Sequence, residues 1–270
     1  MTAALSIEGL RDVKGALSWG AGYLADRGLA DPGMEAGALL SGLLGCSSPN
    51  LLLKRDDLLP ETLIPLYQAM VRRRAQHEPV AYILGRKNFY GRDFFVDPHV
   101  LIPRPETELL VECVLEWMEQ KSSPRILDLG TGSGCIGITL AAIMPSAEVL
   151  AVDISQAALA VAQKNSEIHD VNNVRFTQSD LFQALDAEKK GYFDMILSNP
   201  PYVSTQEIQS LAADLFYEPL IALEAGETGT EVIEKILRHC GMWEESPARG
   251  PPAGEETAVA AISEGRVLLA

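Results

Sequence analysis

The fold is decided by residues 127–134, which read Leu127-Asp128-Leu129-Gly130-Thr131-Gly132-Ser133-Gly134. An apolar run at Arg125–Leu129 leads into the glycines, and a helical apolar pattern at Cys135–Met144 follows them. Glycines at this point let the backbone turn sharply and let a ligand approach the amino end of the helix. A tight turn that binds nothing is the alternative interpretation. The stretch therefore predicts a strand, a cofactor-binding loop and a helix.

Short apolar strands and helices alternate along the chain around this loop. Further strands are expected at Val149–Val152, Val174–Phe176 and Phe193–Leu197. One helix is expected at Ala157–Ile168, and another, before the loop, from Glu106 to about Trp117. Such alternation is typical of successive βαβ units. It predicts an α/β fold with a doubly wound, mostly parallel sheet.

The part of the chain before this sheet has a different pattern. From Glu8 to about Met70 the apolar residues recur at helical spacing, which predicts a small helical unit. Residues 88–103 are rich in aromatic and β-branched residues and contain turn residues, which predicts a β-hairpin. We therefore expect three parts: a helical domain at residues 1–76, a linker with the hairpin at 77–105, and the α/β domain at 106–270.

Charge and composition disfavour several classes of protein. The 270 residues include 37 acids and 22 bases, a formal net charge of −15, whereas most nucleic-acid-binding proteins carry a basic surface. The cysteines form no Cys-x-x-Cys pair and the histidines show no metal-ligand spacing, so neither a disulfide framework nor a metal is expected. The amino end lacks the pattern of a secretion signal, and no apolar run is long enough to cross a bilayer. We expect a cytoplasmic protein that does not bind nucleic acid or membranes directly.

A second acid supports the prediction of a cofactor loop. Asp153 follows the second strand, close to the offset of about 20 residues from the glycines at which an acid binds ribose hydroxyls. The loop reads Gly-x-Gly-x-Gly and contains no Lys or Arg, so a ligand without phosphate is favoured. S-adenosylmethionine fits, because its positive charges tolerate nearby carboxylates. Asp180 and Leu181, after the third strand, are placed to bind adenine, although capping of the next helix is an alternative role for Asp180.

The most specific motif is Ser198-Asn199-Pro200-Pro201-Tyr202, directly after the fourth strand. The lone pair of a planar nitrogen is delocalised, so a site that methylates it must orient the NH2 group with acceptors on both hydrogens. Asn199 supplies a side-chain carbonyl and Pro200 a backbone carbonyl, while Tyr202 can stack on the planar group. A simple turn after a strand is the alternative. The motif predicts methyl transfer to a planar nitrogen.

These motifs define two groups of candidate residues. The candidate catalytic and substrate-binding residues are Asn199, Pro200, Pro201 and Tyr202. The candidate cofactor-binding residues are Asp128, Gly130, Thr131, Gly132, Ser133, Gly134, Asp153, Asp180, Leu181 and Asn199.

Two further stretches are Glu-Pro-Val-Ala-Tyr-Ile-Leu-Gly at 78–85 and Val-Leu-Ile-Pro-Arg-Pro-Glu-Thr-Glu at 100–108. With the glycine loop and the Asn-Pro-Pro-Tyr motif, they make the chain resemble the peptide-chain release-factor glutamine methyltransferases, the HemK/PrmC family. The resemblance extends from about residue 19 to residue 229. In the family manner, Arg104, Glu106 and Glu108 are candidates for contact with cofactor or substrate, and helix capping is an equal explanation for the two acids.

The resemblance implies a function as well as a fold. It implies a class I, Rossmann-like domain that uses S-adenosylmethionine, preceded by a helical domain that helps to grip a protein substrate. The implied substrate and partner is a class 1 translation release factor, methylated on the glutamine of its Gly-Gly-Gln loop. Two alternatives stay open: an adenine-N6 DNA or RNA methyltransferase with the same Asn-Pro-Pro-Tyr motif, and a homologue that binds cofactor without turnover.

The sequence departs from the family pattern after about residue 240, so the α/β domain is expected to be atypical or truncated there. Only Thr257–Ile262 and Gly265–Leu269 have the composition of strands in this region. Either Gly265–Leu269 is the fifth strand, or the last strands are compressed into a short hairpin.

Overall fold

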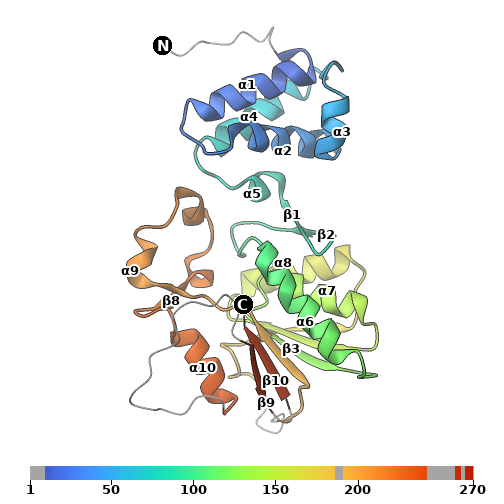
Figure 1. The fold of residues 1–270 in the computed structure, drawn as a ribbon, viewed down its shortest axis with the longest axis vertical. Coiled ribbons are helices and arrows are strands. Elements are labelled where there is room, and N and C mark those ends of the chain that lie inside the picture. The colour runs from blue at the N-terminus through green and yellow to red at the C-terminus, as the bar shows by residue number, and fades with distance from the viewer. Residues whose placement is uncertain (1–9, 186–190, 242–258, 263–264, 270) are drawn as a thin grey trace. The chain divides into compact units, whose positions relative to one another are not determined.

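The computed structural model describes residues 10–185, 191–241, 259–262 and 265–269, and the chain divides into two compact units, residues 1–85 and 86–270 (Figure 1). Each unit has its own cluster of buried apolar side chains. Within the described ranges, no helix has the length and apolar character needed to cross a membrane.

The first unit is helical. Its helices are α1 (Val13–Ala25), α2 (Pro32–Leu44), α3 (Ser48–Leu53), α4 (Ile64–Arg74) and α5 (Val80–Leu84). Asp12 starts α1 by accepting a hydrogen bond from the backbone N–H of Gly15. The ring of Tyr67 is fully buried, and its hydroxyl donates to the carbonyl of Ala36 at 3.2 Å. Gly20 leaves room for that hydroxyl, because a Cβ there would lie 2.2 Å from it. The prediction of a helical unit is confirmed.

A β-hairpin opens the second unit. Strands β1 (Arg86–Phe89) and β2 (Arg92–Phe95) pair antiparallel through a two-residue turn. The turn residues, Tyr90 and Gly91, both have positive φ angles, 49° and 75°, as a tight hairpin turn of the right twist requires. The predicted hairpin is confirmed.

The main sheet of the second unit has the strand order β5-β4-β3-β6-β10-β9 (Figure 1). The strands are β3 (Arg125–Leu129), β4 (Glu148–Asp153), β5 (Val174–Gln178), β6 (Met195–Ser198), β9 (Val259–Ile262) and β10 (Gly265–Leu269). All neighbouring pairs are parallel except β10 and β9. The predicted Rossmann-like, mostly parallel sheet is confirmed.

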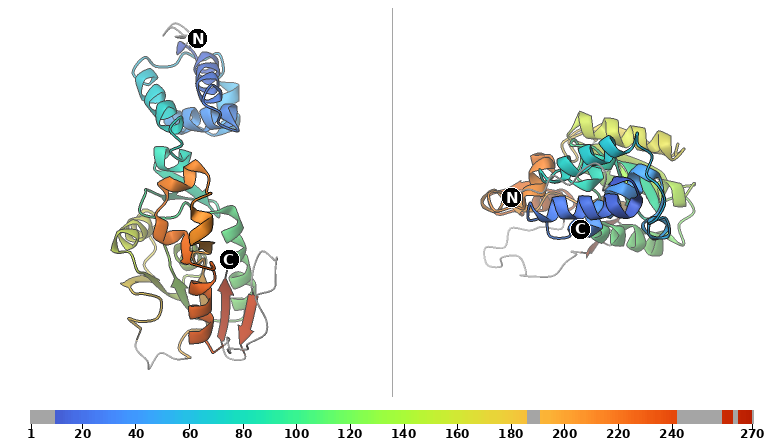
Figure 2. Two further views of the ribbon diagram at one scale, coloured as in Figure 1. Left: turned by 90° about the vertical axis from the view of Figure 1, so that its left-hand side faces the viewer. Right: turned by 90° about the horizontal axis from the view of Figure 1, so that it is seen from above.

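Helices cover both faces of this sheet. They are η2 (Pro105–Thr107), α6 (Glu108–Met118), α7 (Cys135–Ile143), α8 (Gln156–Ile168) and α10 (Glu231–His239). Val114 of α6 and Ile138 of α7 share one buried cluster with Ile126 of β3. The next residue of β3, Leu127, points to the other face and shares a second cluster with Ile236 of α10, which runs alongside β10 (Figure 2). This alternation along β3 produces a three-layer arrangement.

The carboxyl-terminal strands combine both predicted arrangements. Residues 265–269 pair parallel with β6 and form the fifth parallel strand. Residues 259–262 pair antiparallel with them at the edge of the sheet, so the two strands are also antiparallel neighbours. Thr257, the predicted start of this edge strand, lies outside the described residues. The sequence did not predict β7 (Val203–Ser204), α9 (Thr205–Ile208), η4 (Ala213–Tyr217), η5 (Leu220–Ala222) and β8 (Glu224–Gly226).

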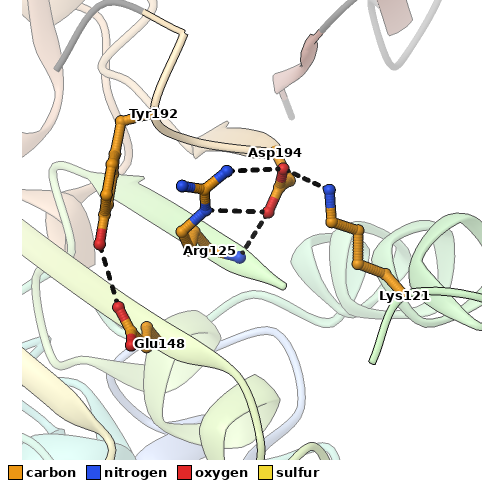
Figure 3. Close-up of polar contacts among 5 residues, drawn as sticks. All are labelled: Lys121, Arg125, Glu148, Tyr192 and Asp194. Atoms are coloured by element: carbon orange, nitrogen blue, oxygen red, sulfur yellow. Dashed lines mark hydrogen bonds and ion pairs between the residues drawn. The ribbon is translucent and has the colours of Figure 1, made fainter. Parts of the chain in front are cut away.

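A polar network joins strands at the amino ends of the parallel sheet (Figure 3). The carboxylate of Asp194, just before β6, accepts hydrogen bonds from the Lys121 ammonium at 2.6 Å and from the backbone N–H of Arg125 at 2.9 Å. The Arg125 guanidinium carbon lies 4.5 Å from the ring centroid of Tyr192, whose hydroxyl donates to Glu148 at 3.1 Å. This network lies at the amino ends of β3 and β4, and their carboxyl ends are free for a binding site.

Candidate active site

A cavity of about 230 Å³ is located where β3, β4, β5 and β6 end. This is where open α/β sheets bind ligands. The predicted site residues that line it are Gly130, Thr131, Gly132, Ser133, Asp153, Asp180, Leu181, Asn199 and Pro201. The other predicted residues, Asp128, Gly134, Pro200 and Tyr202, are not part of this lining. The structure therefore brings most of the two predicted groups around one cavity.

The glycines of the loop serve two different purposes. Gly130 and Gly132 have φ angles of 69° and 54°, in the left-handed region that other residues rarely adopt. A Cβ at Gly130 would meet no protein atom within 4 Å, so this side of the loop leaves space for a ligand. A Cβ at Gly134 would instead lie 2.6 Å from Ile138 and 3.1 Å from Ala162. Gly134 is thus required for the packing of α7 and α8, and it does not line the cavity.

Asp153 lies at the end of β4 with its carboxylate already oriented. One oxygen accepts from the backbone N–H of Gly132 at 2.9 Å, and the other accepts from the N–H of Ser155 at 2.9 Å. Burial raises the pKa of Asp153, and these hydrogen bonds oppose the rise. Each oxygen keeps a lone pair that is available to a hydroxyl of a ligand.

Asp128 lies fully buried beneath the loop. Its Oδ2 accepts from the Thr131 hydroxyl at 2.7 Å and from the Gly137 N–H at 3.1 Å, whereas its Oδ1 has no hydrogen-bond partner. The pKa of Asp128 is raised to about 6, and burial is the main cause. The charge of Asp153 adds to the rise, and the two hydrogen bonds oppose it. A buried carboxylate with an unpaired oxygen favours a cation nearby. This donor set fits S-adenosylmethionine, whose sulfonium and ammonium are positive.

The segment after β5 holds a strained residue at the cavity. Leu181 has a φ of 48°, which is costly for a residue with a branched side chain and is typical of functional sites. The Ser179 hydroxyl holds this turn by donating to the Leu181 carbonyl at 2.7 Å. Asp180 is exposed and accepts from the Gln183 side chain at 2.8 Å. Residues 181–185 form turns, so the alternative of a helix cap at Asp180 does not apply to the described residues.

The Asn-Pro-Pro-Tyr motif begins where β6 ends. Asn199 is half-buried, and its Nδ2 donates to the hydroxyl of Thr107 at 3.2 Å. Its Oδ1 is therefore available to accept from a ligand. Pro200 is buried, whereas Tyr202 is 62% exposed. The motif thus places an acceptor at the cavity and an aromatic ring at the surface.

The sequence prediction missed the contribution of residues 100–107. Four of its residues line the cavity, namely Val100, Leu101, Pro103 and Thr107, and none of them is among the predicted site residues. Neighbouring residues serve to anchor it. The guanidinium of Arg104 donates to the buried carboxylate of Glu218 at 2.6 Å.

The two acids of this stretch lie away from the cavity. Glu106 is exposed, and Glu108 accepts a hydrogen bond from the backbone N–H of Tyr90 in the hairpin turn. Ile221, Ala222, Val232 and Lys235 also line the cavity from the later part of the chain, and none of the four is a predicted site residue. Among the residues that the structure describes, no cluster of three His, Cys, Asp or Glu side chains is arranged to hold a metal ion.

A doubly wound sheet with a glycine loop and an acid beside one cavity defines the class: this is an S-adenosylmethionine-dependent methyltransferase, with S-adenosylmethionine as its cofactor. Residues 105–238 match the methyltransferase small domain, and residues 15–85 match the PrmC N-terminal domain. The release factor glutamine methyltransferase of Chlorobaculum tepidum is 41% identical over 222 residues, which cover 79% of this chain and 75% of that protein.

Two further relatives bear the same name. The protein of Geobacter sulfurreducens is 38% identical over 226 residues, with 83% of this chain and 78% of the relative covered. The protein of Bordetella pertussis is 41% identical over 211 residues, with 77% of each chain covered. The chain belongs to the release factor glutamine methyltransferase family.

Proposed function

We propose that this chain transfers a methyl group from S-adenosylmethionine to the side-chain amide nitrogen of the glutamine in the Gly-Gly-Gln loop of a class 1 translation release factor. The observation that carries the proposal is the hydrogen bond from Asn199 to Thr107, which leaves the carboxamide oxygen of Asn199 as an acceptor at the cofactor cavity. An acceptor in that place suits an NH2 group. Family membership supports glutamine as the residue that bears it.

In this proposal the residues of the chain bind the cofactor and orient the substrate amide. Asn199 and the carbonyl of Pro200 accept the two hydrogens of the substrate amide, which directs the nitrogen toward the cofactor. Tyr202, with its ring exposed, stacks on the planar group. Asp153 binds the ribose hydroxyls, and Gly130 and Gly132 let the cofactor approach the backbone. The cofactor supplies an electrophilic methyl group on a sulfonium.

The helical domain, residues 1–76, helps to grip the release factor, and the hairpin linker joins it to the α/β domain. The protein acts in the cytoplasm and binds its substrate as a protein, without direct contact with nucleic acid. The formal net charge of −15 supports that last point, because it opposes phosphate binding.

The test is incubation of the full chain with methyl-labelled S-adenosylmethionine and either a purified class 1 release factor or duplex DNA. We expect one label on the glutamine of the Gly-Gly-Gln loop, located by mass spectrometry. Replacement of that glutamine by glutamate in the release factor is expected to abolish labelling, because a carboxylate has no NH2 hydrogens. Labelling of DNA adenine, of another site on the factor, or of neither substrate while the cofactor binds would overturn the proposal.

A further inference from the structure

We infer that Lys235 is a cofactor-binding residue whose ammonium donates a hydrogen bond to a ring nitrogen of the adenine of S-adenosylmethionine. The inference goes beyond the proposed function, because it rests on the cofactor and not on the identity of the methyl acceptor. Of the described residues that line the cavity, Lys235 is the only lysine or arginine.

The ammonium of Lys235 is available to a ligand. Lys235 lies in the middle of α10 and is exposed. It has no hydrogen-bond or ion-pair partner among the described residues, whereas Arg238 on the same helix donates to Glu234 at 3.3 Å. An ammonium carries three donors and no acceptor, so Lys235 can offer a ligand only hydrogen-bond donors.

Helix α10 turns the face that carries Lys235 toward the segment after β5. Val232, Lys235 and His239 are three and four positions apart, so they share this face. Val232 packs against the same buried cluster as Leu181. The ring of His239 stacks on the ring of Phe182, with centroids 3.9 Å apart and planes at 5°. Lys235 therefore reaches the cavity on the side of the segment that is predicted to bind adenine.

The charge of the cofactor favours adenine as the ligand of Lys235. The sulfonium and the ammonium of S-adenosylmethionine are positive, and acids at the cavity such as Asp153 and Glu224 suit them. A lysine beside those groups would repel them. Adenine is neutral, and its ring nitrogens N1, N3 and N7 accept hydrogen bonds. With Asp180 predicted to accept from the adenine NH2 group, Lys235 supplies the donor that completes the recognition of the base.

The carboxylate in the methionine part of the cofactor is the other acceptor that a lysine could bind. The contacts of α10 with Leu181 and Phe182 favour adenine, because they place Lys235 by the predicted adenine segment. The carboxylate also has the cofactor's own ammonium beside it, which weakens its attraction for a second cation.

The first experiment measures binding of S-adenosylmethionine to the full chain by calorimetry. Lys235→Met should raise the dissociation constant about 5–10-fold, less than a fully buried hydrogen bond to a charged group would give, because the ammonium is partly solvated. Removal of a positive charge alone would tighten binding of the positive cofactor, so the direction of the change identifies a direct contact. Methionine is a good helix former, and circular dichroism checks the fold.

Arg238→Met is the matched control. It removes a positive charge from the same helix at an exposed position that does not line the cavity. Its dissociation constant for S-adenosylmethionine should stay within about twofold of the parent. Binding by Lys235→Met that is as tight as in the parent or tighter, or an equal weakening in both variants, would overturn the inference.

The second experiment identifies the part of the cofactor that Lys235 contacts. In 5′-methylthioadenosine both the carboxylate and the ammonium are missing, yet the ratio of the dissociation constants of Lys235→Met and parent should persist. A ratio near one with this ligand would assign Lys235 to the carboxylate and would overturn the inference.

Analogues of S-adenosylhomocysteine in which C–H replaces N1, N3 or N7 of adenine complete the test. The same ratio should fall to within about twofold for one analogue and persist for the other two, because only one nitrogen accepts from Lys235. A ratio that persists for all three would overturn the inference. None of these measurements uses the release factor, so a parent chain that fails to methylate it would overturn the proposed function alone.

Discussion

Asn165 of α8 pairs with Phe95 of β2 as a neighbouring strand would. Its Oδ1 accepts from the Phe95 N–H at 2.7 Å, and its Nδ2 donates to the Phe95 carbonyl at 2.9 Å. The same Nδ2 donates to the carbonyl of Ser133 in the glycine loop at 2.8 Å. One fully buried side chain therefore links the hairpin to the cofactor loop.

Asn165→Ala is expected to lower the free energy of unfolding by about 2–4 kcal/mol, because it leaves the part-buried backbone groups of Phe95 and the buried carbonyl of Ser133 without their partner. Urea titration followed by circular dichroism measures this loss. Asn172→Ala, at an exposed position in the following loop, is the control and should change stability by less than about 0.5 kcal/mol. Equal stability of the two variants would contradict the role of Asn165 as a link.

Asp128 predicts how cofactor affinity depends on pH. Because S-adenosylmethionine is positively charged, it favours the ionised form of this carboxylate. The pKa of Asp128 is about 6, so the fraction of ionised carboxylate changes near neutral pH. If binding requires that form, the dissociation constant rises about 10-fold between pH 7.5 and pH 5. Calorimetry on Asp128→Asn should show this pH dependence removed, with only the contribution of Asp153 left. An unchanged pH profile in the variant would rule out Asp128 as its source.

The same pKa predicts a pH effect on the stability of the free chain. Because burial raises the folded-state pKa of Asp128 above its ordinary value of 3.8, the folded state binds a proton that the unfolded state releases. Stability relative to Asp128→Asn should fall as the pH rises from about 4 to about 6, and then stay level. Urea titrations of both chains across this pH range measure the difference in their free energies of unfolding. A difference that stays constant with pH would contradict the prediction.

Asp153→Ala should weaken binding of S-adenosylmethionine by about 1.5–3 kcal/mol, or roughly 10–150-fold, the scale of hydrogen bonds to a charged group. Calorimetry gives the dissociation constants of variant and parent. Gln156→Ala, an exposed neighbour at the start of α8, should bind like the parent. Binding by Asp153→Ala within a factor of two of the parent would show that the ribose assignment is wrong.

Asn199→Ala should lower kcat by roughly 10²–10³ with nearly unchanged cofactor affinity, since an oriented polar group at a reacting centre has effects of that size. Labelled cofactor and release factor provide the rate, and circular dichroism checks the fold. Full turnover, or loss of the fold, would show that the Asn-Pro-Pro-Tyr motif is structural.

Asp194→Ala tests the network at the amino ends of the strands. Burial raises the pKa of Asp194, but hydrogen bonds from Lys121 and Arg125 outweigh burial and hold it below its ordinary value. The carboxylate thus contributes stability above pH 4 that is lost as the pH falls through its folded-state pKa. We expect Asp194→Ala to lower the free energy of unfolding by about 1–3 kcal/mol at pH 7, and by less below pH 4. Thermal unfolding measures the stability, and Glu112→Ala, at an exposed position, is the control. A loss of stability in Asp194→Ala that does not depend on pH would argue against an ionic role for Asp194.

The parts of the fold that depend on local pattern were predictable from the sequence. The glycine loop, β3 to β6 and the hairpin follow from runs of a few residues, and their order along the chain specifies a parallel sheet. β7 consists of only Val203 and Ser204, too short to show any periodicity, so its pairing with β8 was not predictable. β6 starts at Met195, two residues after the predicted start at Phe193, and the preceding Asp194 contacts the start of β3.

The site was predictable only where residues carry their chemistry in a motif. Gly130 and Gly134 lie in one loop, but only a Cβ at 134 would meet Ile138 at 2.6 Å and Ala162, on another helix, at 3.1 Å. Thr107 and Glu218 act through residues about a hundred positions away, and a single sequence does not show such contacts. Local patterns therefore indicated the cofactor loop well and the support of the substrate amide poorly.

The bridge between Glu218 and residues 102–104 has a consequence for the order of folding. It closes separations of 116 residues to Ile102 and 114 residues to Arg104, so its loop-closure cost is high until the intervening strands have assembled. Breaking the bridge does not require the strands of the sheet to separate, so it can open in a local fluctuation of the native state. Hydrogen exchange at the Ile102 amide, which donates to Glu218, would then report a local opening of this bridge while the cofactor loop stays intact.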